Sequence, residues 1–467
     1  MDDYTYTRNR DLSWLDFNRR ILSLTADETI PLLERLRFLS IFSSNLEDFL
    51  QVRVRKLMTF PPDAVDKNSG MTTAELLARI NEAVGELTAF KAQLYQNLTA
   101  RLPPPEFPEE MLRFPPYTPR FPIDMEERRP IMAQVLERDR LLFYPYDSME
   151  PFLRLLAEAS ENPEVSAIKI TVYRLAPQSE IAHLLCRAAE NGKDVTVLVE
   201  LRARLEEENN RAWAEVFRTA GCRVIYGAGN YKCHGKICLI TLKSGRRITQ
   251  IGTGNYNEKT ALQYTDLSFI TAEEQVGLDS ETFFYNMTMG NAPGSYRKLF
   301  VSPHGIKAML LDKINGEIAK GTRGYICLKA NALSERDIID SLAQASMAGC
   351  ETHLIVRGIC CIRPGIPSVT ENIHVKSIVG RYLEHARIYC FGREDQAEYF
   401  IASADMMTRN LSRRIEIACP IHDQRLRVVL KSILDTQLHE KEPQTSFMTQ
   451  KYGKPMNPTH KQEQLTS

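Results

Sequence analysis

The first hundred residues place apolar and polar positions with the period of an α-helix. Apolar side chains three or four residues apart fall on one face of a helix, where they pack against a neighbouring helix. Two such stripes are present: Leu32, Leu33, Leu36, Leu39 and Phe42, and then Leu76, Ile80, Val84, Leu87 and Phe90. The pattern therefore predicts a small antiparallel helical bundle over residues 1–101.

Further along the chain, one helix-and-strand pattern occurs twice. In each copy an amphipathic helix is followed by a glycine and a continuous apolar run, which is typical of a helix, its C-terminal cap and a buried strand. The first copy has Ile181, Leu185, Ala188, Gly192 and the run 195–201, and the second has Ile338, Leu342, Ala345, Gly349 and the run 352–358. The constant offset of 157 residues predicts two α/β domains of common ancestry that face each other across a shared site.

A histidine motif lies at the same place in both copies. His234–Lys236 is predicted to start an apolar strand that leads to the turn Ile251–Asn255, and His385–Arg387 to start a strand that leads to the turn Ile401–Asp405. The order continues with Lys259 and Asp266 in the first copy, and with Arg409 and Glu416 in the second. Generic similarity between βαβ units is the alternative, but it does not explain the matched histidines. Two such motifs are suited to placing an imidazole on either side of one phosphorus atom, which points towards phosphoryl chemistry.

These patterns divide the chain into five segments. Eight prolines lie between Pro103 and Pro122, where they exclude a persistent helix or a central strand. The predicted segments are a helical domain over 1–101, a proline-rich linker over 102–140, α/β domains over 141–292 and 293–438, and a polar tail over 439–467. The predicted fold class is α+β multidomain, with an N-terminal helical bundle before two duplicated α/β domains.

Composition and charge narrow the class of protein. The 467 residues, at 53.3 kDa, are enough for about three domains. Lys+Arg and Asp+Glu are both 59, so no nucleic-acid binding is expected from bulk charge, although a local basic channel could still hold a polyanion. The acidic start, Met1–Asp3, and the lack of a long apolar stretch predict a cytoplasmic protein without a membrane span.

The ten cysteines have no CxxC spacing. Cys233, His234 and Cys238 form the most suggestive group, but alternation along a strand would send Cys233 and His234 to opposite faces, which suits zinc poorly. We therefore expect buried free thiols in a reducing compartment.

The residues around each histidine suggest its chemistry. Lys232 and Lys236 flank His234, and like-charge repulsion lowers the pKa of an imidazole and favours its neutral, nucleophilic form. Attack on a γ-phosphoryl group would give a phosphoramidate and split one transfer into two easier steps. His385 is suited to act as a general acid, with Glu384 or Asp405 nearby to orient it.

Several longer blocks, in matching order, resemble polyphosphate kinase of the histidine-autophosphorylating type. Together they cover nearly the whole chain except the linker and the tail, which makes the resemblance far more specific than one short motif. The blocks are Leu12–Leu15, Ser44–Phe49, Ile168–Arg174, Val199–Arg204, Lys232–Lys236, Ile251–Thr260, Tyr264–Asp266, Leu354–Gly358 and Arg381–His385. The two α/β halves also resemble phospholipase-D-like domains, which agrees with the duplication.

The resemblance implies roles for particular positions. His234 matches the phosphohistidine nucleophile, and His385 matches the second active-site histidine, which also contacts ATP. The remaining matched positions are Asn45, on the base side, and Tyr264 and Arg357 for ATP, and Arg174 and Arg204 for the magnesium site. Guanidinium has no lone pair for a cation, so these two arginines are better suited to clamp phosphate while ATP and water carry Mg²⁺. Ordinary ion pairs with Glu200 or residues 206–208 are the alternative.

Three departures from the two patterns are visible. The phospholipase-D-like motif places Asp where Thr241 stands, and the second copy has Arg387 instead of lysine, both of which make phosphodiester hydrolysis less favourable. Typical polyphosphate kinases carry a helical head domain where this chain has only the proline-rich residues 102–125. Because the head contributes to dimerisation in the family, a homo-oligomer is possible but in doubt, and so is the role of Asn45.

The resulting prediction is an ATP:polyphosphate phosphotransferase. It would move the ATP γ-phosphoryl group reversibly through a phosphohistidine onto the end of a polyphosphate chain, with ATP, ADP and polyphosphate as partners and Mg²⁺ as cofactor. The basic residues predicted for the polyanion path are Lys232, Lys236, Arg246, Arg247, Lys259 and Arg409. Two alternatives are open: a phospholipase-D-like phosphodiesterase, which needs no ATP, and an inactive polyphosphate-binding module.

Overall fold

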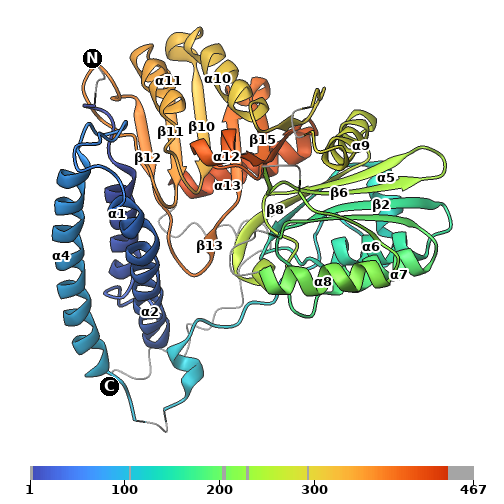
Figure 1. The fold of residues 1–467 in the computed structure, drawn as a ribbon, viewed down its shortest axis with the longest axis horizontal. Coiled ribbons are helices and arrows are strands. Elements are labelled where there is room, and N and C mark those ends of the chain that lie inside the picture. Colours follow the sequence, from blue (N-terminus) through green and yellow to red (C-terminus); the bar gives the residue numbers. More distant parts are fainter. Residues whose placement is uncertain (1–3, 105–106, 202–206, 228–230, 292–293, 440–467) are drawn as a thin grey trace.

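The computed structural model describes residues 4–104, 107–201, 207–227, 231–291 and 294–439. Figure 1 shows a helical bundle at the N-terminus, a second α/β domain beside it, and the first α/β domain on the far side. The predicted fold class is confirmed, because a helical region precedes two domains built on mixed sheets.

The bundle is built on two long antiparallel helices and their neighbours. Its helices are α1 (Arg10–Ser23), α2 (Leu32–Asp48), a π-helical turn (Phe49–Val54), α3 (Arg55–Leu57) and α4 (Thr73–Thr99). A capping box begins α4, because Thr72 and Glu75 satisfy each other's backbone N–H groups. The core contains Leu39, Phe42, Leu76, Ile80 and Leu87 from the two predicted stripes, so these two helices are confirmed.

Residues 102–140, predicted as a linker, contain two short helices. A 3₁₀-helix spans Glu109–Leu112, and α5 spans Ile131–Glu137. Ile131 and Val135 of α5 are buried in the core of the first α/β domain. The described part of the segment therefore begins against the bundle and ends inside the next domain.

The first α/β domain has one sheet with helices on its faces. The strand order is β1-β8-β7-β6-β2-β3-β4, with β2, β3 and β4 parallel and the others antiparallel to their neighbours. Its strands are β1 (Arg140–Tyr144), β2 (Val165–Val172), β3 (Asp194–Val199), β4 (Arg223–Ile225), β5 (Lys232–Cys233), β6 (Lys236–Leu242), β7 (Arg247–Gly252) and β8 (Tyr264–Thr271). Its helices are α6 (Glu150–Glu161), α7 (Glu180–Glu190), α8 (Glu207–Thr219), the 3₁₀-helix Thr260–Leu262 and α9 (Glu274–Thr288).

The second α/β domain repeats that topology. Its order, β12-β11-β10-β14-β15-β17-β9, matches the first sheet read from β4 to β1. Its strands are β9 (Phe300–Val301), β10 (Tyr325–Ala330), β11 (Glu351–Val356), β12 (Ile373–Lys376), β13 (Leu383–Glu384), β14 (Arg387–Phe391), β15 (Glu398–Ala402), β16 (Arg414–Ile415) and β17 (Ile417–Ile421). Its helices are α10 (Gly305–Ile318), α11 (Arg336–Met347), α12 (Thr408–Ser412) and α13 (Gln424–His439), with 3₁₀-helices at Gly321–Arg323 and Glu394–Gln396.

The repeated glycines end corresponding helices in the two domains. Gly192 has φ +79° and Gly349 has φ +86°, a left-handed conformation that costs glycine little. In both places the residue after the glycine donates its N–H back to the helix: Lys193 to Ala188 and Cys350 to Ala345. The predicted helix ends are therefore confirmed.

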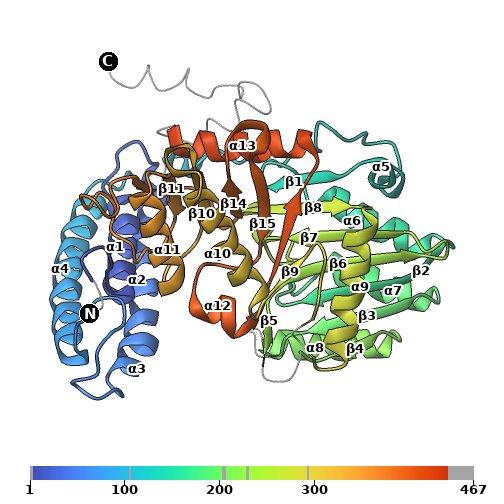
Figure 2. The ribbon, with the colours of Figure 1, turned by 90° about the horizontal axis from the view of Figure 1, so that it is seen from above.

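The two α/β domains exchange short strands. β5 of the first domain pairs in parallel with β16 of the second, and β13 of the second pairs in parallel with β8 of the first. One hydrophobic cluster also joins the two sheets, with Ile237 and Phe269 from the first domain and Ile388 and Ile417 from the second. Figure 2 shows the two domains side by side along this junction. The exchange and the shared core hold the domains in one arrangement.

The bundle is attached to the loop that follows β11. Ser13 Oγ donates to the carbonyl of Cys360 at 3.0 Å and accepts the Cys360 N–H at 2.9 Å. Arg20 donates to the carbonyls of Arg357 and Gly358, both at 3.2 Å. These contacts hold α1 against the loop that carries Arg357.

The structure bears on two predictions from the sequence, the absence of a membrane-spanning helix and the burial of the cysteines. Within the part of the chain that the structure describes, no helix combines the length and apolarity that crossing a membrane requires. All ten cysteines are buried and free, as expected. Cys233 lies on β5, but His234 follows the strand instead of continuing it.

Candidate active site

His234 lies in a short segment of the first domain that pairs with the second domain. Its N–H and that of Gly235 both donate to the carbonyl of Ile415 in the second domain, at 2.8 and 2.9 Å. The prediction placed His234 at the start of a strand, but β5 ends at Cys233 and β6 begins at Lys236. The two residues between the strands pair with the other domain, and this crossing turns the imidazole towards the junction.

A carboxylate from the second domain holds the His234 ring. Nδ1 of His234 is 2.9 Å from Oε2 of Glu416, and Lys236 Nζ is 3.0 Å from the same Nδ1. Lys236 also donates to the His234 carbonyl at 2.5 Å. The ring of Tyr173 meets the imidazole edge-on, with centroids 4.7 Å apart. Because Nδ1 faces Glu416, Nε2 is the nitrogen left to react.

Glu416 is buried but remains a carboxylate. Ser403 Oγ donates to its Oε2 and Asn410 Nδ2 donates to its Oε1, each at 2.6 Å. Burial by itself would raise the pKa of this carboxyl, but His234, Lys236 and the Ser403 hydrogen bond outweigh it and lower the pKa to about 2. The charge opposite His234 is therefore permanent at neutral pH.

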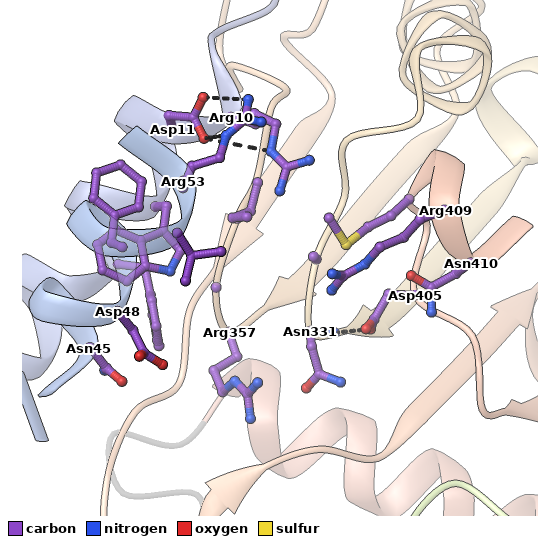
Figure 3. Close-up of a pocket in the computed structure, with 18 of the residues that line it drawn as sticks. Arg10, Asp11, Asn45, Asp48, Arg53, Asn331, Arg357, Asp405, Arg409 and Asn410 are labelled. Atoms are coloured by element: carbon purple, nitrogen blue, oxygen red, sulfur yellow. Dashed lines mark hydrogen bonds and ion pairs between the residues drawn. The ribbon is translucent and has the colours of Figure 1, made fainter. Parts of the chain in front are cut away.

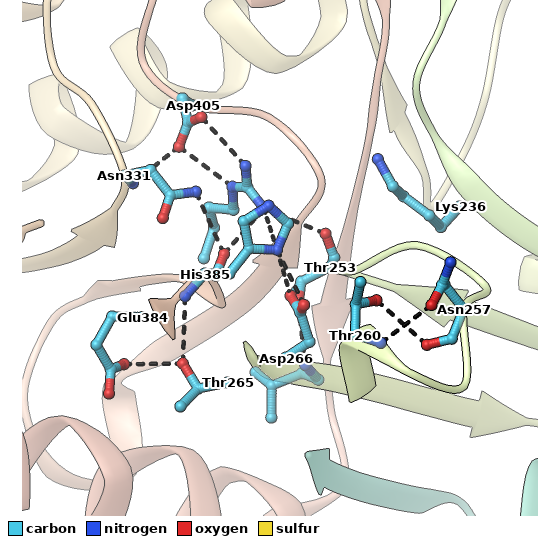
Figure 4. Close-up of polar contacts among 12 residues, drawn as sticks. Lys236, Thr253, Asn257, Thr260, Thr265, Asp266, Asn331, Glu384, His385 and Asp405 are labelled. Atoms are coloured by element: carbon cyan, nitrogen blue, oxygen red, sulfur yellow. Dashed lines mark hydrogen bonds and ion pairs between the residues drawn. The ribbon is translucent and has the colours of Figure 1, made fainter. Parts of the chain in front are cut away.

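His385 has the mirror arrangement, shown in Figure 4. Its Nδ1 is 2.9 Å from both carboxylate oxygens of Asp266, which belongs to the first domain. Thr253 Oγ1 donates to Asp266 at 2.6 Å, as Ser403 does to Glu416 in the other half. The guanidinium of Arg387 lies 3.2–3.3 Å from the two ring nitrogens of His385.

The prediction that Glu384 or Asp405 orients His385 was wrong, because Asp266 holds the ring. Glu384 accepts instead from Lys329 Nζ at 2.7 Å and from Thr265 Oγ1 at 2.9 Å, and Asp405 pairs with Arg387 at 3.1 Å. Neighbouring residues of an extended segment point to opposite sides, so Glu384 cannot face the imidazole that follows it. The repeat of Asp266 and Glu416 was the available signal, but it does not reveal that each carboxylate serves the histidine of the other domain.

Burial is the first cause of the lowered histidine pKa values. It lowers the pKa of His234 to about 3 and that of His385 to about 4, and both carboxylates oppose the shift. Nearby cations, Lys236 for His234 and Arg387 for His385, lower the pKa further. The direction of the shift is as expected, but its main cause is desolvation, and the cation that adds to it is Lys236.

Both histidines line one cavity of about 590 Å³ between the bundle and the second domain. Figure 3 shows Asn45 on the bundle side facing Arg357, Asn331 and Arg409 across this space. The basic lining residues among those described are Arg10, Arg53, Lys56, Arg357, Arg387, Arg409 and Arg414. Burial, followed by the nearby Arg414 and Arg10, lowers the pKa of Arg409. The gathering of these cations in the lining makes the cavity suited to a polyanion.

Arg357 has two guanidinium N–H groups that could bind an anion. Its Nε and Nη1 atoms are buried, and neither has a hydrogen-bond partner within the described part of the protein. Burial lowers the pKa of its guanidinium to about 10, so the side chain still carries its charge at neutral pH. A phosphate oxygen would satisfy both the N–H groups and the charge.

The other predicted site residues fall into three groups. Asn45 lines the cavity with the histidines, and Tyr264 lies against His385, with ring centroids 5.6 Å apart. Arg174 directly follows Tyr173, which contacts His234, but it does not line the cavity. Arg204 lies outside the described residues.

The basic residues predicted for the polyanion path do not all lie at the cavity. Arg409 lines the cavity. Arg246 donates to the carbonyl of Leu136, and Arg247 forms an ion pair with Glu281 at 2.8 Å, so both are engaged elsewhere. Arg10, Lys56 and Arg414 were missed, because each comes from a segment with no motif and reaches the cavity only through the fold.

The described part of the chain offers no ready-made protein site for a metal ion. Among the described residues, no three or more His, Cys, Asp or Glu side chains lie together so that they could hold one. The acidic residues lining the cavity are Asp11, Asp48 and Asp405. Asp11 is already paired with Arg53 at 2.7 Å, and Asp405 with Arg387. The donor set therefore does not fit a metal bound by protein alone.

One glycine of the repeated turn is required by the site. A Cβ atom on Gly254 would lie 2.1 Å from Oδ2 of Asp266, which holds His385. The corresponding position in the second domain is Ala404, so the two halves differ here. Glycine in the first copy leaves room for the carboxylate beside the imidazole.

The fold and site together define a protein with duplicated α/β domains, each of which contributes one histidine to a single basic cavity. Three family models match the chain: polyphosphate kinase N-terminal domain over residues 7–105, C-terminal domain 1 over 130–293 and C-terminal domain 2 over 299–467. Only residues 106–129 separate the first model from the second.

Named relatives and one solved structure agree with these models. Polyphosphate kinase of Staphylococcus epidermidis is 42% identical over 335 residues, covering 70% of this chain and 46% of that protein. The Bacillus cereus polyphosphate kinase is 43% identical over 331 residues, covering 70% of this chain and 47% of that protein. The crystal structure of polyphosphate kinase from Porphyromonas gingivalis has a TM-score of 0.77 and 27% identity, and covers 93% of each chain.

The chain therefore belongs to the polyphosphate kinase family, and the resemblance seen in its motifs is confirmed. It spans about half the length of the curated relatives it matches. The histidine-autophosphorylating type and the missing head domain stay predictions.

Proposed function

We propose that this protein is an ATP:polyphosphate phosphotransferase that works through a phosphohistidine on His234. One observation carries the proposal. Glu416 holds Nδ1 of a neutral His234, and the His234 side chain lines a basic cavity together with His385 and Arg357. Family membership supplies the substrate class, since the relatives are named polyphosphate kinase. A neutral imidazole held at one nitrogen is prepared to attack with the other.

The proposed reaction has two steps. Nε2 of His234 attacks the γ-phosphorus of ATP, the N–P bond forms, and the bond to the bridging oxygen breaks so that its electron pair leaves with ADP. The terminal oxygen of a polyphosphate chain then attacks the phosphohistidine and releases Nε2. Because both steps use the same groups, the site also runs in reverse and makes ATP from polyphosphate.

His385 and the cationic residues would serve both steps. Bound phosphates raise the pKa of a nearby imidazole, so His385 can gain the proton that a leaving oxygen needs while Asp266 holds its Nδ1. Arg357, with Asn45 and Tyr264 nearby, would bind ATP, and Arg174 and Arg204 would act as phosphate clamps. Mg²⁺ would arrive on the ATP phosphates and neutralise part of their charge, since the described residues do not form a metal site.

The partners, location and oligomeric state of the protein are also proposals. ATP, ADP and polyphosphate are the proposed partners. A cytoplasmic location is a further proposal, as is a homo-oligomer that forms without the head domain, which is predicted to be missing from the interval 106–129 between two family models.

The pH dependence of ATP turnover follows from the lowered histidine pKa values. We expect the acid side of the kcat/KM profile for magnesium-saturated ATP to show no limb from His234 down to about pH 5, because this imidazole, the proposed nucleophile, remains neutral well below neutral pH. Since the neutral ring is the nucleophile, a lowered pKa extends activity towards lower pH. An acid limb near pH 6.5 would mean that a histidine titrates at its ordinary value.

Labelling from ATP tests the proposed function. The wild-type protein is incubated with γ-labelled ATP and magnesium, then assayed for acid-labile, alkali-stable label and for polymeric phosphate in the medium. Label and polymer together are expected. Label without polymer would show a working nucleophile without an acceptor path. No label, with polyphosphate still bound, would favour the binding module, and ATP-independent hydrolysis of a phosphodiester would favour the phosphodiesterase.

A further inference from the structure

A second cavity adjoins the catalytic one and has a different lining. Its volume is about 440 Å³, and it shares Phe17 and Arg357 with the catalytic cavity. Among the described residues, apolar side chains such as Phe17, Phe38, Phe114 and Tyr382 line it, together with five charged ones, Arg357 and Arg381 among them. A ligand whose phosphates lie at His234 and Arg357 could therefore extend an aromatic, uncharged part into this space, as a nucleoside triphosphate would.

The proline-rich linker forms one wall of this nucleoside cavity. Phe114 packs against the bundle core, and the Arg381 guanidinium lies over its ring, 5.3 Å from the centroid. Arg381 Nη2 also donates to the carbonyl of Pro115 at 2.6 Å. The same guanidinium lies over Tyr382, at 5.1 Å. Arg381 is therefore held between the linker and its own neighbour.

The linker is anchored on both sides of this contact. Beyond Phe114, Tyr117 OH donates to the carbonyl of Tyr146 at 3.1 Å, and the Ser148 N–H donates to the carbonyl of Arg120 at 2.8 Å. The bundle thus holds the linker at Phe114 and the first α/β domain holds it a few residues later. Because the linker is held at both points, it can fix the position of the Arg381 side chain.

Arg381 begins the segment that leads to the second histidine. Leu383 donates its N–H to the carbonyl of Gln263 at 3.0 Å and pairs with Tyr264, which contacts His385. Leu383 and Tyr264 both line the nucleoside cavity. Holding Arg381 therefore sets the shape of this wall and the path of the chain towards His385.

We propose that Phe114 is a positioning residue for nucleotide binding. Through Arg381, it closes the nucleoside cavity and places the 381–385 segment against the nucleoside of ATP. The inference rests on the proposed function, because it takes ATP as the substrate. It assigns to the linker a part of the substrate site that sequence alone described only as a connection between domains.

Replacing Phe114 with leucine tests this role. Leucine keeps an apolar side chain in the bundle but removes the ring beneath Arg381, so we expect the ATP dissociation constant and KM to rise about fivefold with kcat unchanged. Phe114→Tyr keeps the ring and should bind ATP as the wild type does. Phe107→Leu is the matched control, because Phe107 is an exposed linker aromatic that lines neither cavity.

Calorimetry with two probes separates positioning from a general loss of structure. Inorganic tripolyphosphate has no nucleoside, so Phe114→Leu should weaken the binding of ATP and leave the binding of tripolyphosphate unchanged. Equal weakening of both probes, or no change in ATP affinity, would overturn the inference, and so would a wild type that binds no ATP. Because binding is measured without turnover, a protein that binds ATP but acquires no label would contradict the proposed function and leave this test intact.

Discussion

His234→Gln should leave no acid-labile label on the protein after incubation with γ-labelled ATP, and should lower polyphosphate synthesis by at least about 10⁴-fold. Glutamine retains a polar side chain of similar reach but offers no nucleophilic ring nitrogen to the phosphorus. The N–P bond that stores the phosphoryl group can then not form. Label is measured on the separated protein, and polymer in the medium.

His183→Gln is the matched control for this loss. His183 belongs to the same domain, on α7, where it is exposed and stacks edge-on against Trp213 outside the catalytic cavity. This variant should label as the wild type does. If His234→Gln still acquired label and His385→Gln did not, the nucleophile would have to be reassigned to the second domain.

Glu416→Gln should lower the rate of phosphoryl transfer by about 10²–10⁴-fold with little change in ATP affinity. The side chain keeps its size, but the amide no longer supplies the negative charge 2.9 Å from Nδ1 that fixes the ring and its tautomer. The amide nitrogen would also face a donor in either orientation, because Ser403 donates to one carboxylate oxygen and Asn410 to the other. Single-turnover labelling measures the first step directly.

The control for the charge removed is Glu281→Gln. Glu281 pairs with Arg247 at the far end of β7, away from the catalytic cavity. Its replacement removes one carboxylate from an ion pair without touching a histidine, so labelling should continue at the wild-type rate. A Glu416→Gln protein that labelled equally fast would reduce Glu416 to a structural residue of the domain junction.

The fold was largely predictable because its signals are local. The helical stripe through Leu76, Ile80 and Leu87 and the glycines at 192 and 349 depend on spacing along one element. Such patterns survive without knowledge of the partner element, since a buried face must be apolar whatever covers it. The repeat then predicted two domains of one topology, which the matching strand orders confirm.

The candidate site was predictable only in part. The two histidines could be found because each carries its own motif, and Arg357 and Asn45 came from family blocks. The partners Glu416 and Asp266 were visible as an echo, but their assignment depends on β5 and β13 each pairing with the other domain. Arg10, Lys56 and Arg414 carry no motif, and they meet only because the bundle packs on the second domain.

By itself, the sequence determined a helical region, a duplicated α/β pair, a histidine in each half and membership of one family. Local periodicity and repeated motifs encode those properties within a few tens of residues. Only the tertiary structure decided which carboxylate holds which histidine, how burial lowers their pKa values, and that Phe114 of the linker lies beneath Arg381. These depend on contacts between residues more than a hundred positions apart, and on desolvation, which exists only once the chain has folded.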